Sequence, residues 1–309
     1  LSLHDSLPIY GKMTEKPLIS VVMTTFNEEK YIRQGVLSLV DQADEIIIRD
    51  NASTDGTISI CQDLSSKYPN IDFQVMKEKK RIFPGLLEAF KAVNGKYVHF
   101  FGVHDLLATG TLPRLAGVLE QNPDASMAFP KYIHMEEDGT NQKEYIYNSV
   151  QELASGKSLE RIFASIAILV SQLCTITQSL YRADVFEYAF SIIPSFACDY
   201  GIIARAAEKG KILQVKEGTY YRRFFEGKIA KKAVMLRHSK HLIDERFAHL
   251  HPQALVCEEM MRLIKSQNSP VVERAMYLEN TRRIFQERFN YNDPRTIEMH
   301  MEDMHLHYG

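Results

Sequence analysis

The 309-residue chain has only four cysteines, and their positions exclude two common uses of this residue. They lie too far apart for a C-x-x-C redox pair or for the ligand spacing of a zinc site. We therefore expect reduced thiols in a cytoplasmic protein. The chain also lacks an excess of charge of either sign, since 37 Lys and Arg residues stand against 39 Asp and Glu residues. This balance excludes a general attraction to nucleic acid or to an anionic membrane, so any such contact must come from a local patch.

No hydrophobic run is long enough to cross a bilayer. The longest apolar stretch, residues 162–176, is interrupted by Ser165, Ser171 and Gln172 and falls short of the roughly 20 residues that a spanning helix needs. The first residues have no initial Met, no basic segment and no long apolar core. We interpret residues 1–16 as a disordered leader or tail outside the fold.

Strand and helix patterns alternate from Leu18 onward. Apolar, β-branched runs predict four strands, and amphipathic patterns predict helices between them, the first of them capped by Asn27. The predicted strands are Leu18–Thr24, Glu45–Arg49, Ile71–Met76 and Lys96–Phe101, and the predicted helices begin near Asn27, Thr54 and Gly85. This alternation indicates βαβ units and a mainly parallel α/β sheet, whose ligands bind beyond the carboxyl ends of the strands.

The second half of the chain is less regular. We expect helices over Thr111–Gln121 and Asp199–Lys209, and strands over Ala125–Phe129, Ile176–Leu180 and Ile212–Val215. From Lys228 the pattern is helical and charged. The sequence therefore predicts an α/β domain over residues 17–226 and a helical C-terminal extension over residues 227–309.

Polar residues follow each of the four predicted strands. Thr24, Phe26 and Asn27 come after the first, and the aromatic ring of Phe26 is a candidate stacking surface for a base. Asp50 and Asn51 follow the second strand as hydrogen-bond acceptors. A basic cluster that ends in Arg81 follows the third, where it faces either a diphosphate or solvent. His104 and Asp105 follow the fourth, in a place suited to a divalent cation beside a phosphorylated ligand.

Taken together, these segments resemble the family-2 glycosyltransferases of the GT-A fold. Ile19–Asn27 is similar to their opening strand, Asp50–Thr57 to their Asp-Asp-Gly-Ser-Thr-Asp-Gly-Thr string, and Gly95–Leu107 to the strand that leads into their D-x-D motif. The resemblance implies a GT-A-like, Rossmann-type sheet flanked by helices. It also implies a nucleotide-sugar donor, expected to be UDP-linked, and a glycan or lipid-linked acceptor.

The resemblance assigns roles residue by residue. It implies that Thr24, Phe26, Asp50 and Asn51 hold the base and ribose, that His104 lies beside the ribose, and that Asp105 binds Mn²⁺ or Mg²⁺. Tyr221-Arg222-Arg223 resembles the family's Tyr-Arg-Arg ending, so we expect Arg222 at the donor. Asp199 matches the acidic residue that opens a helix as the general base of an inverting transfer, although an acid at that position is also a plain helix cap.

Two other functions compete with this interpretation. A sugar-phosphate nucleotidyltransferase would need a Gly-rich loop after the first strand, and Thr24–Lys30 contains no Gly. A non-catalytic binding relative is favoured only by the loss of acidic residues at Gly102–Asp105. The basic segment Lys228–Lys240 predicts either a peripheral membrane contact or, as we prefer, the solvated face of a packed helix.

Overall fold

The computed structural model describes residues 18–80, 82–171, 174–193, 198–225 and 253–289. The predictions for the leader at 1–16, for Arg81 and for the basic segment Lys228–Lys240 fall outside these ranges.

Four parallel strands form the first half of the sheet, as the sequence predicts. They run in the order β3 (Ile71–Val75), β2 (Glu45–Asp50), β1 (Ile19–Thr25) and β4 (Tyr97–Phe100). Thr25 lies opposite Asp50 in the register, so the carboxyl ends of β1 and β2 meet at one edge. The core side chains of β1 and β2 are almost fully buried, which explains their continuous apolar runs.

The rest of the sheet is mixed in direction. It continues from β4 through β8 (Leu180–Arg182), β6 (Ala125–Met135) and β9 (Lys211–Arg223) to β5 (Leu106–Leu107), and β7 (Lys143–Tyr145) pairs with β6. β6 and β9 are much longer than expected, because they pair in parallel along nearly their whole length. The register shifts between Pro130 and Lys131, next to a proline that has no N–H to donate.

The predicted strand Ile176–Leu180 is wrong. A 3₁₀ turn, η1 (Cys174–Thr177), occupies most of this segment, and the strand begins only at Leu180. The reason is local hydrogen bonding: the Gln178 N–H donates to Thr175 O, and the Ser179 hydroxyl donates to Ile176 O. Polar side chains that satisfy the backbone of a turn compete with strand pairing.

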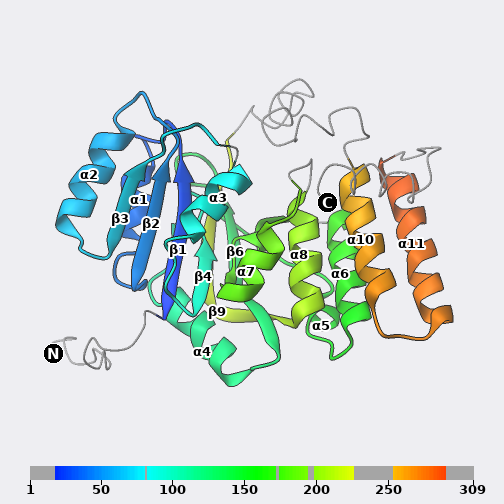
Figure 1. Ribbon diagram of the computed structural model, residues 1–309. Coiled ribbons are helices and arrows are strands. Elements are labelled where there is room, and N and C mark those ends of the chain that lie inside the picture. Colours follow the sequence, from blue (N-terminus) through cyan, green and yellow to red (C-terminus); the bar gives the residue numbers. More distant parts are fainter. Residues whose placement is uncertain (1–17, 81, 172–173, 194–197, 226–252, 290–309) are drawn as a thin grey trace, which may run out of the picture.

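The helices cover both faces of the sheet and one end of it. The first of them, α1, is short and begins at Ile32, so the predicted cap at Asn27 is wrong. In Figure 1, α3 and α7 lie in front of the strands, and α6, α8, α10 and α11 stand side by side at the right. The bounds of the helices are α1 (Ile32–Leu37), α2 (Thr57–Lys67), α3 (Ile82–Phe90), α4 (Thr111–Gln121), α5 (Val150–Leu153), α6 (Ser158–Ser171), α7 (Ala183–Phe190), α8 (Cys198–Lys209), α10 (Ala254–Ser266) and α11 (Val271–Phe289).

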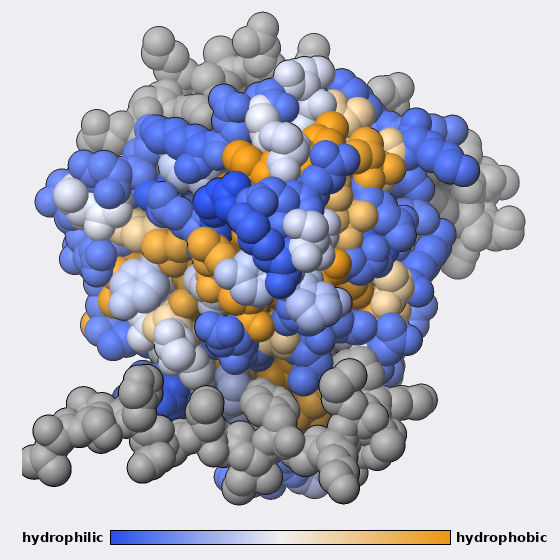
Figure 2. Space-filling view, turned by 90° about the vertical axis from the view of Figure 1, so that its left-hand side faces the viewer, coloured by the Kyte–Doolittle hydropathy of each residue, from blue (hydrophilic) through white to orange (hydrophobic). Residues whose placement is uncertain are grey.

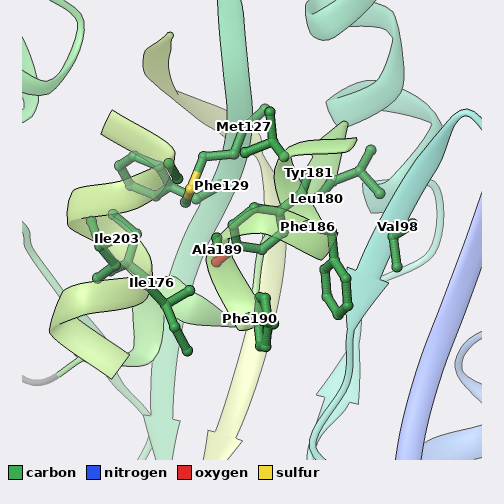
Figure 3. Close-up of a cluster of buried hydrophobic side chains, with 14 of the residues drawn as sticks. Val98, Met127, Phe129, Ile176, Leu180, Tyr181, Phe186, Ala189, Phe190 and Ile203 are labelled. Carbon is green, nitrogen blue, oxygen red and sulfur yellow. The ribbon is translucent and has the colours of Figure 1, made fainter. Parts of the chain in front are cut away.

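One hydrophobic core joins the sheet to these helices. Figure 3 shows its centre, where Phe186 and Phe190 of α7 pack beside Tyr181 of β8. The Phe186 and Phe190 rings stack with centroids 4.1 Å apart, and Tyr181 meets Phe186 edge to face at 5.7 Å. The same core extends to buried residues of α10 and to Phe285 of α11. The proposed boundary at residue 226 therefore does not separate two hydrophobic cores, and the domain division stays a prediction.

The surface of the N-terminal half mixes hydrophilic and hydrophobic side chains, as Figure 2 shows for the face at the left of Figure 1. Within the described ranges, every helix is too short or too polar to traverse a bilayer.

Candidate functional site

The loops that follow β1 and β2 are bound to each other at the carboxyl edge of the sheet. The Asp50 carboxylate is buried and accepts hydrogen bonds from the Ser53 N–H at 2.8 Å and the Ser53 hydroxyl at 2.6 Å. Ser53 Oγ in turn accepts from the Asn27 N–H, and Asn27 Oδ1 accepts from the Thr54 N–H. We call this arrangement the interlocked loops. Asp50 and Asn27, predicted to face the nucleotide, are used here to hold the two loops together.

Asn27 can make this contact because of its backbone conformation. Its φ is 54°, in the left-handed region that Asn tolerates better than most residues. Further along the loop, Glu29 accepts from the Gly56 N–H and donates its own N–H to Asp55. The string after β2 is therefore a capped turn.

Phe26, the candidate stacking surface for the nucleotide base, lies beside the interlocked loops. The Phe26 ring is 44% exposed, and the Lys79 ammonium lies 4.9 Å from its centroid. Thr24 is half-buried against Gly85 of α3. Asn51 holds the loop after β3, because its side chain accepts from the Lys80 N–H and donates to Lys80 O. An open cavity of about 390 Å³ adjoins that loop and is lined by residues including Lys77, Lys80 and Glu88.

Asp105 lies beyond the tip of β4 and is completely buried. One carboxylate oxygen accepts from the Arg223 N–H at 2.8 Å, and the other accepts from the Tyr220 hydroxyl at 2.8 Å and from Gln178 Nε2 at 3.3 Å. Burial and the carboxylate raise the pKa of Tyr220 well above its ordinary value, so the phenol remains a donor. Asp105 thus joins the strand tip to β9.

Gly102 allows this packing. A Cβ at this position would lie 2.5 Å from Asp105 Oδ2 and 2.7 Å from Gln178 Nε2. Any other residue at position 102, including the Asp expected from the D-x-D motif, would displace the carboxylate or the amide. The absence of an acid at position 102 is therefore a condition for the buried hydrogen bonds of Asp105.

His104 points to a different partner. Its Nδ1 lies 3.6 Å from Glu28 Oε1, and its ring meets Phe225 edge to face at 5.0 Å. Burial lowers the pKa of His104, but the Glu28 and Asp105 carboxylates raise it more, so the pKa lies above its ordinary value. His104 and Glu28 form the half-buried polar pair at this edge.

Arg222 reaches the same region from β9. Its guanidinium donates to the Thr175 hydroxyl at 3.0 Å and lies 5.5 Å from the Phe224 ring. Because side chains alternate along a strand, Arg222 shares a face with Tyr220. Asp199 lies in the first turn of α8, which packs against η1, the turn that holds Thr175. The fold thus connects the neighbourhoods of Arg222 and Asp199 through one short turn.

The side chains at the strand tip do not suit a divalent cation bound by Asp105. Both carboxylate oxygens already accept hydrogen bonds inside the protein, and Gly102 stands where a second acid is expected. Within the described ranges, no three His, Cys, Asp or Glu side chains are grouped as a metal site. His104 and Glu28 offer one nitrogen and one carboxylate at this edge, so a cation held there would have to take its other ligands from the diphosphate and from water.

The sequence does not predict the roles of three residues of this site. Glu28 pairs with His104, and Tyr220 and Gln178 bind Asp105. The alternation of β9 could have placed Tyr220 beside Arg222, had the strand been predicted beyond Val215. Gln178 carries no comparable signal, because it lies in a turn that the sequence presents as a strand.

Comparisons with known proteins agree with the fold. In sequence, the chain is 26% identical over 237 residues to an uncharacterized glycosyltransferase of Methanocaldococcus jannaschii, covering 68% of this chain and 79% of that one. It is 30% identical over 136 residues to a putative teichuronic acid biosynthesis glycosyltransferase of Bacillus subtilis, covering 43% and 53% of the two chains. In structure, it is similar to S. aureus TarS in complex with UDP-GlcNAc, with a TM-score of 0.63, 18% identity and coverage of 87% and 73%.

The TarS likeness confirms the GT-A fold that the family resemblance of the sequence implies. The model of the glycosyl transferase family 2 matches residues 20–188, more than half of the chain. That match includes β1, β2 and β4 and the loops that follow them. The chain accordingly belongs to glycosyl transferase family 2 and is a glycosyltransferase.

Proposed function

We propose that this protein is an inverting glycosyltransferase that moves a sugar from a UDP-linked donor to a hydroxyl group of a glycan or lipid-linked acceptor. The observation that carries the proposal is that Phe26 and His104 follow parallel strands at the carboxyl edge of the sheet, where the charge of Arg222 acts on His104. An exposed aromatic ring suits a base, and a guanidinium suits a diphosphate. The similarity to TarS, whose structure holds UDP-GlcNAc, supports a UDP-linked donor.

The proposed reaction is a single displacement. The acceptor hydroxyl gives its proton to the Asp199 carboxylate while its oxygen forms a bond to the anomeric carbon. The bond from that carbon to the β-phosphate oxygen breaks, and the electron pair leaves with UDP. Because base and leaving group act on opposite faces of the carbon, the configuration inverts.

The side chains at the edge stabilise the leaving group. Negative charge grows on the diphosphate as the bond breaks, and preorganised donors aimed at that charge lower the barrier. Arg222 is the permanent cation that we assign to this role. The Mn²⁺ or Mg²⁺ expected from the family resemblance takes no part in this scheme, because the side chains around Asp105 do not suit a bound cation.

The proposed acceptor is a glycan or a lipid-linked saccharide. The Bacillus subtilis relative is named as a putative glycosyltransferase of teichuronic acid biosynthesis, which supports a glycan acceptor. A peripheral membrane contact at the cytoplasmic face, through the basic segment 228–240, remains a prediction.

Asp199→Asn tests the proposed base. We expect a fall in turnover of about 10²- to 10⁴-fold, because an amide cannot take the acceptor proton. UDP affinity, measured by calorimetry, should change little. The donor for the assay is first identified by thermal stabilisation with a set of UDP-sugars, and transfer or slow donor hydrolysis is then measured.

Asp184→Asn is the matched control. Asp184 is also an acid in the first turn of a helix, α7, but it is exposed. Its replacement removes the same kind of helix-end charge and should leave turnover unchanged. Full activity in Asp199→Asn would show that another group takes the proton.

A further inference from the structure

We propose that Asp105 is a positioning residue that holds the Arg222 guanidinium against the donor diphosphate. In this role the guanidinium neutralises the diphosphate charge that the family resemblance assigns to a metal ion at Asp105. The inference rests on the proposed function, because it needs a diphosphate at the carboxyl edge of the sheet. It assigns the strand tip a different task from cation binding.

The first argument is that both oxygens of the Asp105 carboxylate accept hydrogen bonds inside the protein. Three donors converge on it: the Tyr220 hydroxyl and the Arg223 N–H, both from β9, and the Gln178 amide from the turn before β8. The side chain is fully buried, so a cation could reach it only after these hydrogen bonds break. Leaving such buried donors unsatisfied is costly.

The second argument is the position of Arg222 between two of these contacts. Tyr220 precedes Arg222 by two residues and Arg223 follows it directly, and both bind Asp105 at 2.8 Å. The Gly102 N–H also donates to the Tyr220 hydroxyl, which ties the strand tip to the same point. The backbone of Arg222 is thus fixed on either side, while its guanidinium is half-buried on the Thr175 hydroxyl.

The third argument is the chemistry of the guanidinium. It stays charged across the physiological pH range and binds phosphate oxygens through paired N–H donors. Arg223, its neighbour, cannot share the role, because its side chain donates to His104 O and to Glu137 O on the other face of β9. Arg222 is therefore the basic side chain of β9 that the fold leaves for the diphosphate.

The experiment compares UDP with uridine, which lacks the diphosphate, by calorimetry on the full chain. Wild-type protein is titrated with each ligand in EDTA and again with Mn²⁺. Asp105→Asn, Arg222→Gln and the double variant are titrated in the same way. Lys216→Gln is the control, since Lys216 is an exposed base on the same strand.

We expect wild-type UDP affinity to differ by less than about twofold between EDTA and Mn²⁺. Arg222→Gln should weaken UDP binding by about 10- to 100-fold, the range for a charge-assisted hydrogen bond, and leave uridine binding nearly unchanged. Asp105→Asn should show a smaller loss that is also specific to UDP. The double variant should bind no more weakly than Arg222→Gln alone, because Asp105 acts through Arg222.

Three results would overturn the inference. In the first, wild-type protein binds UDP with Mn²⁺ but not in EDTA, and Asp105→Asn no longer responds to Mn²⁺. Another is an equal loss of UDP and uridine in Asp105→Asn, which would indicate general disruption of the site. The third is no binding of UDP under either condition, which would also reject the UDP-linked donor of the proposed function. The first two leave that function intact.

Discussion

At the scale of single residues, His99 shows how burial fixes a protonation state. It lies on β4 with no exposed surface, and its Nδ1 bonds to Ser179 O at 2.9 Å. Burial lowers its pKa to about 4. The neutral ring is thus part of the polar layer beneath the strand tip, next to the turn that carries Gln178.

We predict that this histidine makes the fold sensitive to mild acid. Between the ordinary pKa of about 6.5 and the folded value, the unfolded chain takes up a proton that the folded chain does not. Stability therefore falls as the pH drops from 6.5 toward 4, by about 3 kcal/mol for this residue. Urea unfolding at pH 7 and pH 5 measures the part of this loss that falls between those two pH values, about 2 kcal/mol.

His99→Gln is the comparison variant for this prediction. It should lose less stability than wild type between the two pH values. Some dependence should remain, because the pKa of His134 is also lowered to about 4. An unchanged pH dependence in the variant would exclude His99 as a source of the effect.

Residue identities alone could not separate ligand-facing acids from structural ones. Asp50 and Asp105 both follow strands at the edge where ligands bind, and both are consumed by internal hydrogen bonds. Their donors, Ser53 and Tyr220, lie 3 and 115 residues away in sequence. The nearer partner is visible in the string after β2, whereas the farther one depends on the tertiary fold.

At the scale of elements, helix α1 approaches the strand tip closely. A Cβ on Gly35 would lie 2.7 Å from Val103 O and 3.2 Å from the Phe101 ring. The contact involves backbone, so a side chain at this position could not be accommodated by a rotamer change. Gly35 sets the distance between α1 and the loop that carries His104 and Asp105.

Two glycine substitutions with opposite expected signs test this contact. Gly35→Ala should destabilise the fold by about 1–3 kcal/mol through overpacking. Gly117→Ala, in α4, meets nothing within 4 Å and should stabilise by about 0.5–1 kcal/mol, because Ala is the better helix former. Denaturant unfolding measures both. Equal effects would show that helix propensity, and not the close approach, governs Gly35.

Helices and strands are predicted correctly where the hydrophobic residues repeat with one period. The prediction fails where the length of a strand depends on pairing with a distant strand. The four parallel strands and α4 carry clear periodicity, and the helix predicted over Asp199–Lys209 forms one residue early as α8. The extra length of β6 and β9 comes from their mutual pairing. Residues such as Lys216 and Gly218 give no strand signal of their own, so this length could not be read from the sequence.

At the scale of the whole molecule, a charged contact joins the C-terminal helices to the rest of the fold. Glu259 of α10 accepts from Arg205 of α8 at 2.6 Å and from Arg262 at 2.7 Å. Burial raises the pKa of Glu259, but the two guanidinium groups lower it more, so the carboxylate stays charged. The side chains of Arg205 and Glu259 are only 13% and 11% exposed.

Glu259→Gln should therefore lower the free energy of unfolding of the entire chain, by about 3 kcal/mol, since it leaves a buried Arg without its charge partner. We expect one transition, with the same midpoint by far-UV circular dichroism and by tyrosine fluorescence. Glu279→Gln, which removes an acid that is 76% exposed, should change stability by less than about 0.5 kcal/mol. Two separate transitions would support the division near residue 226.

The interlocked loops have a consequence for protein engineering. Asn27 contacts Ser53 and Thr54, and Asp50 contacts Ser53, so each loop supplies groups that complete the other. A chimera that takes only one of the two loops from a relative would break the reciprocal contacts. On the proposed function, in which these loops contact the donor, we expect donor preference to transfer between relatives only when residues 24–29 and 50–57 are exchanged as one unit.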